Sequence, residues 1–202
     1  MRWFTADLHF GHTNICLYAG RPYENVDEMN EDLIRRWNHK VAPVDEVYVL
    51  GDIAMGKIDQ TLNLVTELHG KKVLVPGNHD RCWRGNLKKK HRDTSTNWME
   101  RYEDVGLNII EGSFEFDLAG VKVLVDHFPY RGDSRDEERF VECRPVDAGL
   151  WLLHGHVHEK WRVMDKMINV GVDAWGGYPV SELELIELIG HKPQNCVPLS
   201  WS

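Results

Sequence analysis

Short apolar runs that stop abruptly at polar residues recur along the chain. They cover residues 3–6, 47–50, 73–75, 121–125, 150–153 and 167–170. Because the runs are short, rich in β-branched residues and bounded by Gly and Pro, they predict strands that are buried on both faces. Asp, His or Gly follows each run within two residues, so polar clusters are expected at the carboxyl ends of strands. Open α/β sheets bind their ligands at these ends.

Helical spacing separates several of the predicted strands. Apolar residues repeat every three or four positions over 29–41, after Asp27 as an expected N-cap. Similar stripes over 58–68 and 98–105 end at Gly70 and Gly106, the residue type that commonly follows a helix. We interpret all three stripes as surfaces that pack on a core.

The pair Ser181 and Glu184 predicts the start of another helix. A serine followed three residues later by a glutamate is typical of a capping box, and Leu185, Ile186 and Ile189 follow at helical spacing. Strands and helices therefore alternate along the chain, which is typical of a mixed α/β fold.

The composition favours one globular domain. The chain has 202 residues, of which 42% are hydrophobic and 28% charged. No apolar run is long enough to cross a membrane, and Asp7 comes too early for a signal peptide. The four cysteines form no CxxC pair, as expected for reduced thiols. We therefore expect a soluble cytoplasmic protein without a membrane partner.

The formal net charge of −8 argues against a general nucleic-acid binder. Residues 88–92 (Lys-Lys-Lys-His-Arg) form the one basic cluster, which could contact RNA or be a solvated loop. The mixed acidic and basic run 133–139 is interpreted as a solvated loop. No stable nucleic-acid partner is expected.

Three histidines at alternate positions end the predicted strand 150–153. His154, His156 and His158 lie within five residues, and neutral imidazole is the commonest metal ligand in proteins. A single buried histidine would more often be a core group with its nitrogens satisfied. Three of them indicate a metal, whose remaining ligands must come from elsewhere in the chain.

The clusters at the predicted strand ends supply such ligands in a familiar order. They are Asp7-x-His9, Gly51-Asp52, Gly77-Asn78-His79-Asp80, His127 and Gly155-His156-x-His158. This series resembles the calcineurin-like metallophosphoesterases, whose pattern is DxH, GD, GNHD or GNHE, a lone His and GHxH. Segment 7–15 is similar to the small bacterial and phage branch of that family. The resemblance implies a single-domain βα sandwich of two facing sheets flanked by helices.

The resemblance also implies two divalent metal ions that share one carboxylate. The first set of ligands would be Asp7, His9, Asp52 and His158, and the second Asp52, Asn78, His127 and His156. The alternation in DxH and GHxH is expected to place both side chains of each motif on one side of a strand. A mixed nitrogen and oxygen shell suits Mn, Fe, Zn, Co or Ni, and we expect Mn²⁺.

Other residues are expected beside the metals. By resemblance, His79 protonates the leaving oxygen while Asp80 orients its ring. Asn78 and His12 are candidate substrate contacts, although His12 could instead stiffen its loop. Arg131 could reach a phosphate or could be a surface arginine paired with Asp133.

His154 lies outside the GHxH motif, and we interpret it as a strand-end group that supports the site without binding metal. The expected function is hydrolysis of small phosphodiesters, with 2′,3′- or 3′,5′-cyclic nucleotides as the leading candidates. A nuclease, a phosphomonoesterase or a protein phosphatase is the alternative. A scaffold that has lost catalysis is disfavoured because no ligand is missing.

Overall fold

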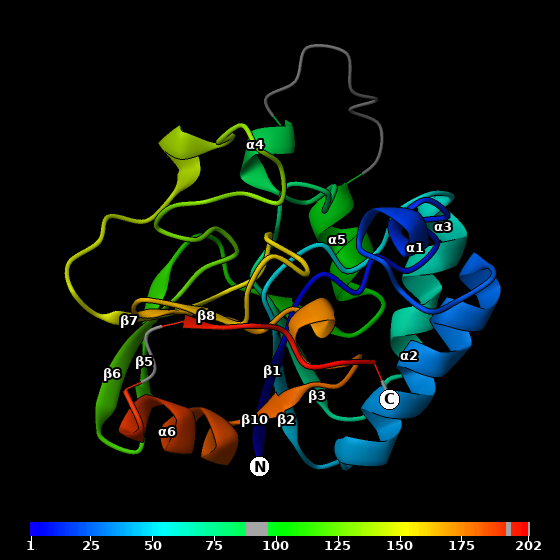
Figure 1. Cartoon of the computed structure of the whole chain (residues 1–202). Helices are drawn as coiled ribbons and strands as arrows, with labels where there is room; N and C mark the ends of the chain where they lie inside the picture. The colour runs from blue at the N-terminus through cyan, green and yellow to red at the C-terminus, as the bar shows by residue number, and fades with distance from the viewer. Residues whose placement is uncertain (88–96, 193–194, 202) are drawn as a thin grey trace.

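A computed structural model describes residues 1–87, 97–192 and 195–201. The basic cluster 88–92 lies outside the described residues. Two sheets form the centre of the molecule (Figure 1). The first has the order β10-β1-β2-β3-β4, and the second has the order β11-β8-β9-β7-β6-β5. The predicted architecture of two sheets flanked by helices is confirmed.

The first sheet is parallel except at one edge. Its strands are β1 (Arg2–Thr5), β2 (Glu46–Val49), β3 (Lys71–Leu74), β4 (Leu107–Ile109) and β10 (Val180–Ser181). Strands β1 to β4 are parallel, and β10 pairs antiparallel with β1. The carboxyl ends of β1 to β3 therefore lie together at one edge of the sheet.

The second sheet is mixed. Its strands are β5 (Phe114–Leu118), β6 (Val121–Val125), β7 (Trp151–His154), β8 (Val163–Met164), β9 (Met167–Asn169) and β11 (Asn195–Cys196). The central strands β6, β7 and β9 are parallel, and the others pair antiparallel at the two sides. Each of the six predicted strands is present, as β1, β2, β3, β6, β7 and β9.

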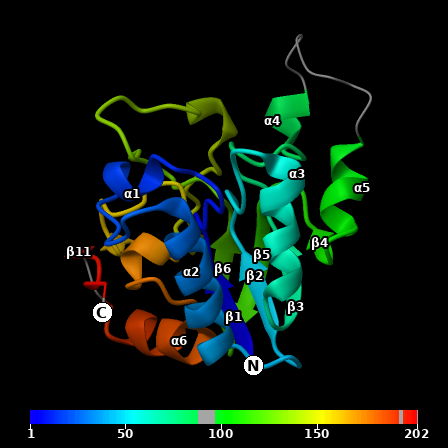
Figure 2. The ribbon, with the colours of Figure 1, turned by 90° about the vertical axis from the view of Figure 1, so that its right-hand side faces the viewer.

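The helices are α1 (Ile15–Tyr18), α2 (Val26–Lys40), α3 (Ile58–Thr61), α4 (Arg84–Leu87), α5 (Trp98–Glu103) and α6 (Glu182–Gly190). Helices α2, α3 and α5 pack on the outer face of the first sheet, as Figure 2 shows for α2 and α3, whereas α6 packs into the core between the two sheets. Short 3₁₀-helices cover Leu62–Glu67, Val141–Cys143 and Val172–Ala174. No helix of the described residues is long and apolar enough to cross a membrane.

Two details of the predicted helices are wrong. The N-cap of α2 is Asn25, whose side chain accepts a hydrogen bond from the amide of Glu28 at 2.9 Å, so the helix begins before Asp27. The stripe over 58–68 is α-helical only in its first turn and continues as a 3₁₀-helix. The capping box is confirmed, because Ser181 and Glu184 exchange side-chain to backbone hydrogen bonds of 3.2 and 2.8 Å.

Alternate residues of the first sheet enter two separate cores. Trp3, Val47 and Val49 pack against the helices on one face. Phe4 and Leu50 pack on the other face against the second sheet, where Leu153 and others meet them. Because β1 to β3 are buried on both faces, their side chains are fixed and their carboxyl ends are held rigidly relative to the second sheet.

Candidate functional site

The loops after β1, β2, β3, β6 and β7 converge at one edge of the two sheets. They carry every expected metal ligand: Asp7, His9, Asp52, Asn78, His127, His156 and His158. The first two loops stay paired beyond their strands, because the amides of Asp7 and His9 donate to the carbonyls of Gly51 and Asp52 at 3.0 Å. These backbone hydrogen bonds therefore fix the two loops relative to each other in the site.

Left-handed backbone places many of these side chains. Five of the nine non-glycine residues with positive φ among the described residues are expected ligands: Asp7, His9, Asp52, His156 and His158. Their φ values lie between 50° and 73°, a region that residues with a Cβ atom rarely adopt. The prediction that DxH and GHxH lie on strands, with alternate residues on one side, is therefore wrong. Both motifs begin after their strands end, and strained left-handed backbone sets the direction of their side chains.

Asp52 lies between His9 and His127, which belong to the first and the second expected ligand set. Its Oδ2 atom is 3.7 Å from His9 Nε2 and 3.7 Å from His127 Nε2. One carboxylate oxygen midway between two imidazoles fits a bridging ligand. Burial raises the pKa of Asp52, but the nearby His127 and His79 more than offset this, and the net shift is downward.

The remaining ligands form a group on each side of Asp52. The rings of His9 and His158 are 5.1 Å apart, and the rings of His127 and His156 are 5.3 Å apart. Asn78 Oδ1 lies 3.1 Å from His127 Nε2, so a neutral amide oxygen joins the second group. Asp7 is near both groups, since its carboxylate lies within 4.8 Å of ligand atoms of His9, His158, Asp52 and His127.

Polar atoms without partners show that these side chains fit metal ions. Asp7 Oδ1 and His9 Nε2 are buried and have no hydrogen-bond partner. A buried polar atom left unpaired is costly, so such atoms usually bind an ion or water. Gly77 keeps the space open: a Cβ atom there would lie 2.4 Å from Asp52 Oδ1. The donor set, its burial and its open nitrogens therefore fit two divalent cations.

The protonation states of four of the expected ligands also suit metal binding. Burial lowers the pKa values of His9, His127 and His156, which keeps these imidazoles neutral at pH 7. Burial raises the pKa of Asp7 to about 7. Neutral histidine is the ligand form, and a cation would draw the Asp7 proton away.

Buried carboxylates orient two of the histidines. Asp173 Oδ2 lies 3.0 Å from His158 Nδ1, which leaves Nε2 for a metal. Asp173 is held by Arg21 at 2.7 and 2.9 Å, and Arg21 also donates to the Asp7 carbonyl at 2.6 Å. Burial raises the pKa of Asp173, but Arg21 and His158 outweigh it and lower the value to about 2. An ionised carboxylate on the far nitrogen fixes the tautomer and makes the imidazole a better ligand.

Asp133 performs the same role for His156. Its Oδ2 atom lies 3.1 Å from His156 Nε2, which leaves Nδ1 for a metal. Arg139 donates to Asp133 Oδ1 at 2.5 and 3.1 Å. The interpretation of 133–139 as a solvated loop is therefore wrong at its first residue, because the Asp133 carboxylate is buried in the site. The burial of Asp133 could not be predicted, because the mixed charges of this run are typical of an exposed segment.

His79 is exposed at the rim of the site. Its ring lies 5.3 Å from the ring of His9, and its amide donates to Asp52 Oδ1 at 2.8 Å. The prediction that Asp80 orients the His79 ring is wrong, because the Asp80 carboxylate has other partners among the described residues. Its carboxylate accepts hydrogen bonds from the amides of Asp52, Ile53 and Gly77 at 2.7, 3.1 and 2.8 Å. Asp80 therefore ties the loops after β2 and β3 together.

Three further candidates have distinct places. His12 is half-buried beside His9, and burial lowers its pKa to about 4. Arg131 does not pair with Asp133; it forms an ion pair with Asp165 and lies 4.0 Å from Asp147, outside the cavity described below. His154 is fully buried, with Nδ1 2.7 Å from the Gly155 carbonyl and no place among the ligand groups.

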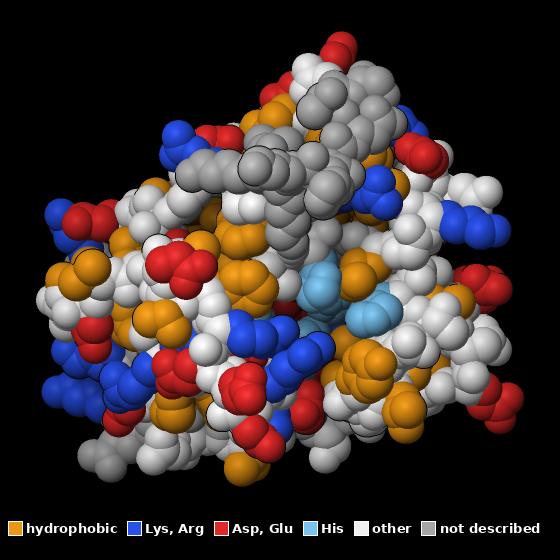
Figure 3. Space-filling model, turned by 90° about the horizontal axis from the view of Figure 1, so that it is seen from above, with side chains coloured by type: hydrophobic (Ala, Val, Ile, Leu, Met, Phe, Trp, Pro, Cys, Tyr) orange, Lys and Arg blue, Asp and Glu red, His pale blue; other side chains and the backbone are white. Residues whose placement is uncertain are grey.

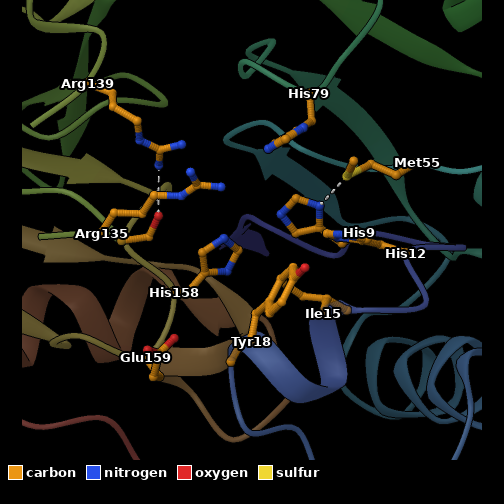
Figure 4. Close-up of a pocket in the computed structure, with 12 residues that line it drawn as sticks. His9, His12, Ile15, Tyr18, Met55, His79, Arg135, Arg139, His158 and Glu159 are labelled. Carbon is orange, nitrogen blue, oxygen red and sulfur yellow. Dashed lines mark hydrogen bonds between the residues drawn. The ribbon is translucent and has the colours of Figure 1, made fainter. Parts of the chain in front are cut away.

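A cavity of about 530 Å³ opens over the ligands. In Figure 3 the exposed histidines lie in a hollow, with Lys or Arg side chains on one side and hydrophobic side chains on another. The lining residues are His9, His12, Ile15, Tyr18, Ala19, Met55, His79, Ser134, Arg135, Arg139, His158 and Glu159 (Figure 4). A cavity of this size admits an organic ester with its phosphoryl group at the histidines.

Known proteins match the chain over nearly its whole length. The model of the calcineurin-like phosphoesterase superfamily domain matches residues 4–172. The gene 66 protein of Mycobacterium phage L5 is 34% identical over 198 residues, covering 94% of each chain. An uncharacterized protein of Methanocaldococcus jannaschii is 30% identical over 196 residues, covering 93% of this chain and 90% of that protein. The crystal structure of a protein of unknown function from Aquifex aeolicus has a TM-score of 0.67 at 25% identity, covering 93% of this chain and 98% of that one.

Proposed function

Because the chain belongs to the calcineurin-like phosphoesterase superfamily, we propose that it is a phosphodiesterase that hydrolyses small cyclic nucleotides with two divalent metal ions. The family supports metal-dependent phosphoester hydrolysis. The proposal adds the diester preference, the nucleotide class, manganese as the metal and the roles of individual residues.

The position of Asp52 is the observation that carries the proposal. A carboxylate oxygen 3.7 Å from imidazole nitrogens on both sides fits two cations that share one ligand. Two such cations supply Lewis-acid chemistry, because they neutralise phosphoryl charge and lower the pKa of water. Asn78 adds an uncharged ligand, so the site keeps less negative charge against an incoming phosphate.

The chain's own residues would handle the leaving group. His79 is exposed at the cavity rim beside the ligands, where an imidazole can donate a proton to a departing ribose oxygen. A ribose alkoxide is strongly basic and needs this proton, whereas a phenolate with a low pKa does not. A histidine in this place favours esters of alcohols over activated aryl esters.

The residues that line the cavity support a nucleotide as the substrate. Ile15 and Tyr18 of α1 line one wall, and Tyr18 is 64% exposed, so its ring is free to contact a flat base. Stacking of a base on an aromatic side chain is worth about 1–3 kcal/mol. A small cyclic nucleotide fits within such a cavity, while a polymer would need an extended basic surface.

The test combines metal analysis with a substrate panel. Wild-type protein loaded with Mn²⁺ is assayed on 2′,3′- and 3′,5′-cyclic nucleotides, bis-p-nitrophenyl phosphate, p-nitrophenyl phosphate and single-stranded RNA. We expect turnover of a cyclic nucleotide and two bound ions per chain. Preference for the monoester or for RNA would refute the cyclic-nucleotide proposal.

Asp52→Asn is the critical variant for the metal centre. It should lose both ions and fall at least 100-fold in kcat/KM, because the shared charge is removed. Asp59→Asn, the same change at an exposed helix position, is the control. Two tightly bound ions with near-normal activity in Asp52→Asn would contradict the bridging role.

A further inference from the structure

The cavity has two chemically different walls. Helix α1 contributes Ile15 and Tyr18 on one side, and the loop after β6 contributes Ser134, Arg135 and Arg139 on the other. Figure 4 shows the Arg135 guanidinium extended into the cavity toward His9 and His79. A molecule with a net charge of −8 thus places two cationic side chains over its ligand groups.

The two arginines are not equivalent. Arg139 is paired with the buried Asp133 carboxylate at 2.5 Å and donates to Ser134 Oγ at 3.1 Å. The Arg135 guanidinium forms no hydrogen bond or ion pair with any residue that the structure describes. An arginine presents its donors in a planar fork that suits phosphate and carboxylate oxygens. Arg135 is exposed, lines the cavity and keeps its guanidinium donors available to an anion there.

The loop holds Arg135 in this position. Its backbone amide donates to Asp133 Oδ1 at 3.2 Å, and the amide of Arg139 donates to Asp133 Oδ2 at 3.0 Å. Phe140 anchors the far end, with its ring 5.3 Å from Phe128 and 5.6 Å from His156. The backbone on both sides of Arg135 is thus fixed to Asp133 and Phe140, which both contact His156.

We infer that Arg135 binds a second anionic group of the substrate, so that the preferred ester is a nucleotide with a phosphate in addition to the scissile one. This inference rests on the proposed function. The scissile phosphoryl group belongs at the ligand histidines, and a cavity of about 530 Å³ leaves room for a second group. Glu159 lines the same cavity, and its carboxylate confines an anion to the wall with Arg135 and Arg139.

The test compares two substrates that differ only in the second phosphate. Adenosine 2′,3′-cyclic phosphate and its 5′-phosphorylated form are assayed with Mn²⁺-loaded protein. Wild-type kcat/KM should be about 10- to 100-fold higher for the 5′-phosphorylated form, as expected for charge-assisted hydrogen bonds. Arg135→Ala should remove this preference, so that kcat/KM falls far more for the 5′-phosphorylated form than for the plain cyclic nucleotide. Arg135→Lys should keep part of it, because the charge remains without the fork.

Binding provides a readout independent of turnover. In calorimetric titrations, adenosine 3′,5′-bisphosphate should bind the wild-type protein more tightly than adenosine 3′-monophosphate. The ratio of the monophosphate Kd to the bisphosphate Kd should fall toward one in Arg135→Ala. Arg35→Ala, which removes an exposed arginine of α2, should leave both the kcat/KM preference and the Kd ratio unchanged. Equal losses on both substrates, or no loss on either, would refute the second-phosphate site. Failure of the wild-type protein to hydrolyse any phosphoester would instead refute the proposed function, while the Kd ratio would still test Arg135.

Discussion

At the scale of single residues, the site depends on strained backbone and on buried partners. The resemblance of the motifs to the metallophosphoesterase pattern predicts Asp7, His9 and Asp52 as ligands, and the structure brings them together. Their left-handed φ values were not predictable, because Asp and His usually adopt other conformations. Asp173 and Arg21 were also missed: each stands alone in sequence, and only folding brings Asp173 to His158.

Replacement of His79 tests its role as a proton donor. His79→Ala should slow hydrolysis of a cyclic nucleotide by about 10²–10⁴-fold, the range for a positioned acid. A p-nitrophenyl diester should lose much less, because its leaving group departs without a proton. Both substrates are measured on the same metal-loaded preparation, with metal content as the control. Equal losses on the two substrates would mean that His79 contacts the phosphoryl group in both reactions.

At the scale of elements, the burial pattern of a strand decides whether it can be predicted from the sequence. Strands β1, β2, β3 and β7 were predicted because they are buried on both faces and appear as continuous apolar runs. The short strands β8, β10 and β11 have two residues each, too few for any period to be recognised. Strand β5 alternates Phe and Leu with Glu and Asp, the pattern of a strand with one solvent face, and it was missed beside the stronger runs.

Asp80 is expected to act on the loops after β2 and β3. Its two oxygens accept three backbone hydrogen bonds, and Asp80→Asn replaces one of these oxygens by an NH2 group that cannot accept. An unsatisfied buried amide should lower the free energy of unfolding by about 1–3 kcal/mol. Metal affinity should fall as well, since the Asp52 loop loosens. Urea unfolding and metal titration measure both effects, with Asp59→Asn as control. A selective loss on cyclic nucleotides at unchanged stability would restore the expected role in orienting His79.

Helix α2 should carry a measurable pH dependence through Asp32. This carboxylate accepts from Tyr23 at 2.7 Å and from Arg36 at 2.5 Å. Burial raises its pKa, but the bonds to Arg36 and Tyr23 outweigh this, and the net shift is downward. The stabilisation is therefore present above the unfolded pKa of about 3.9 and is lost as pH falls through the lower folded value.

Asp32→Asn should remove this part of the pH dependence. The variant should lose on the order of 1 kcal/mol at pH 7 and show a shallower loss of stability between pH 5 and 3. Urea unfolding across this range is the measurement. Glu31→Gln, a neighbouring exposed acid on the same helix, should leave the slope as in wild type. Parallel slopes in wild type and Asp32→Asn would contradict the depressed pKa.

At the scale of the whole molecule, the candidate metal centre joins the two sheets. Asp7, Asp52 and Asn78 follow strands of the first sheet, while His127 and His156 follow strands of the second. The shared core beneath them contains Phe4 and Leu50 from one side and Leu153 from the other. Ions held by both sets of loops would therefore stabilise the sandwich as a unit.

Metal ions should raise the thermal stability of the whole chain. A ligand that binds only the folded state at about 100 times its Kd adds about 2.7 kcal/mol, and for a chain of this size that raises Tm by about 5–10 °C. Protein treated with EDTA should melt lower, and Tm should rise with the logarithm of added Mn²⁺ in one cooperative transition. The repulsion between the buried Asp7 and Asp52 is part of what the cations relieve. Asp52→Asn should flatten this dependence, and Asp59→Asn should retain it. An equal rise of Tm in both variants would place the stabilising ions elsewhere on the molecule.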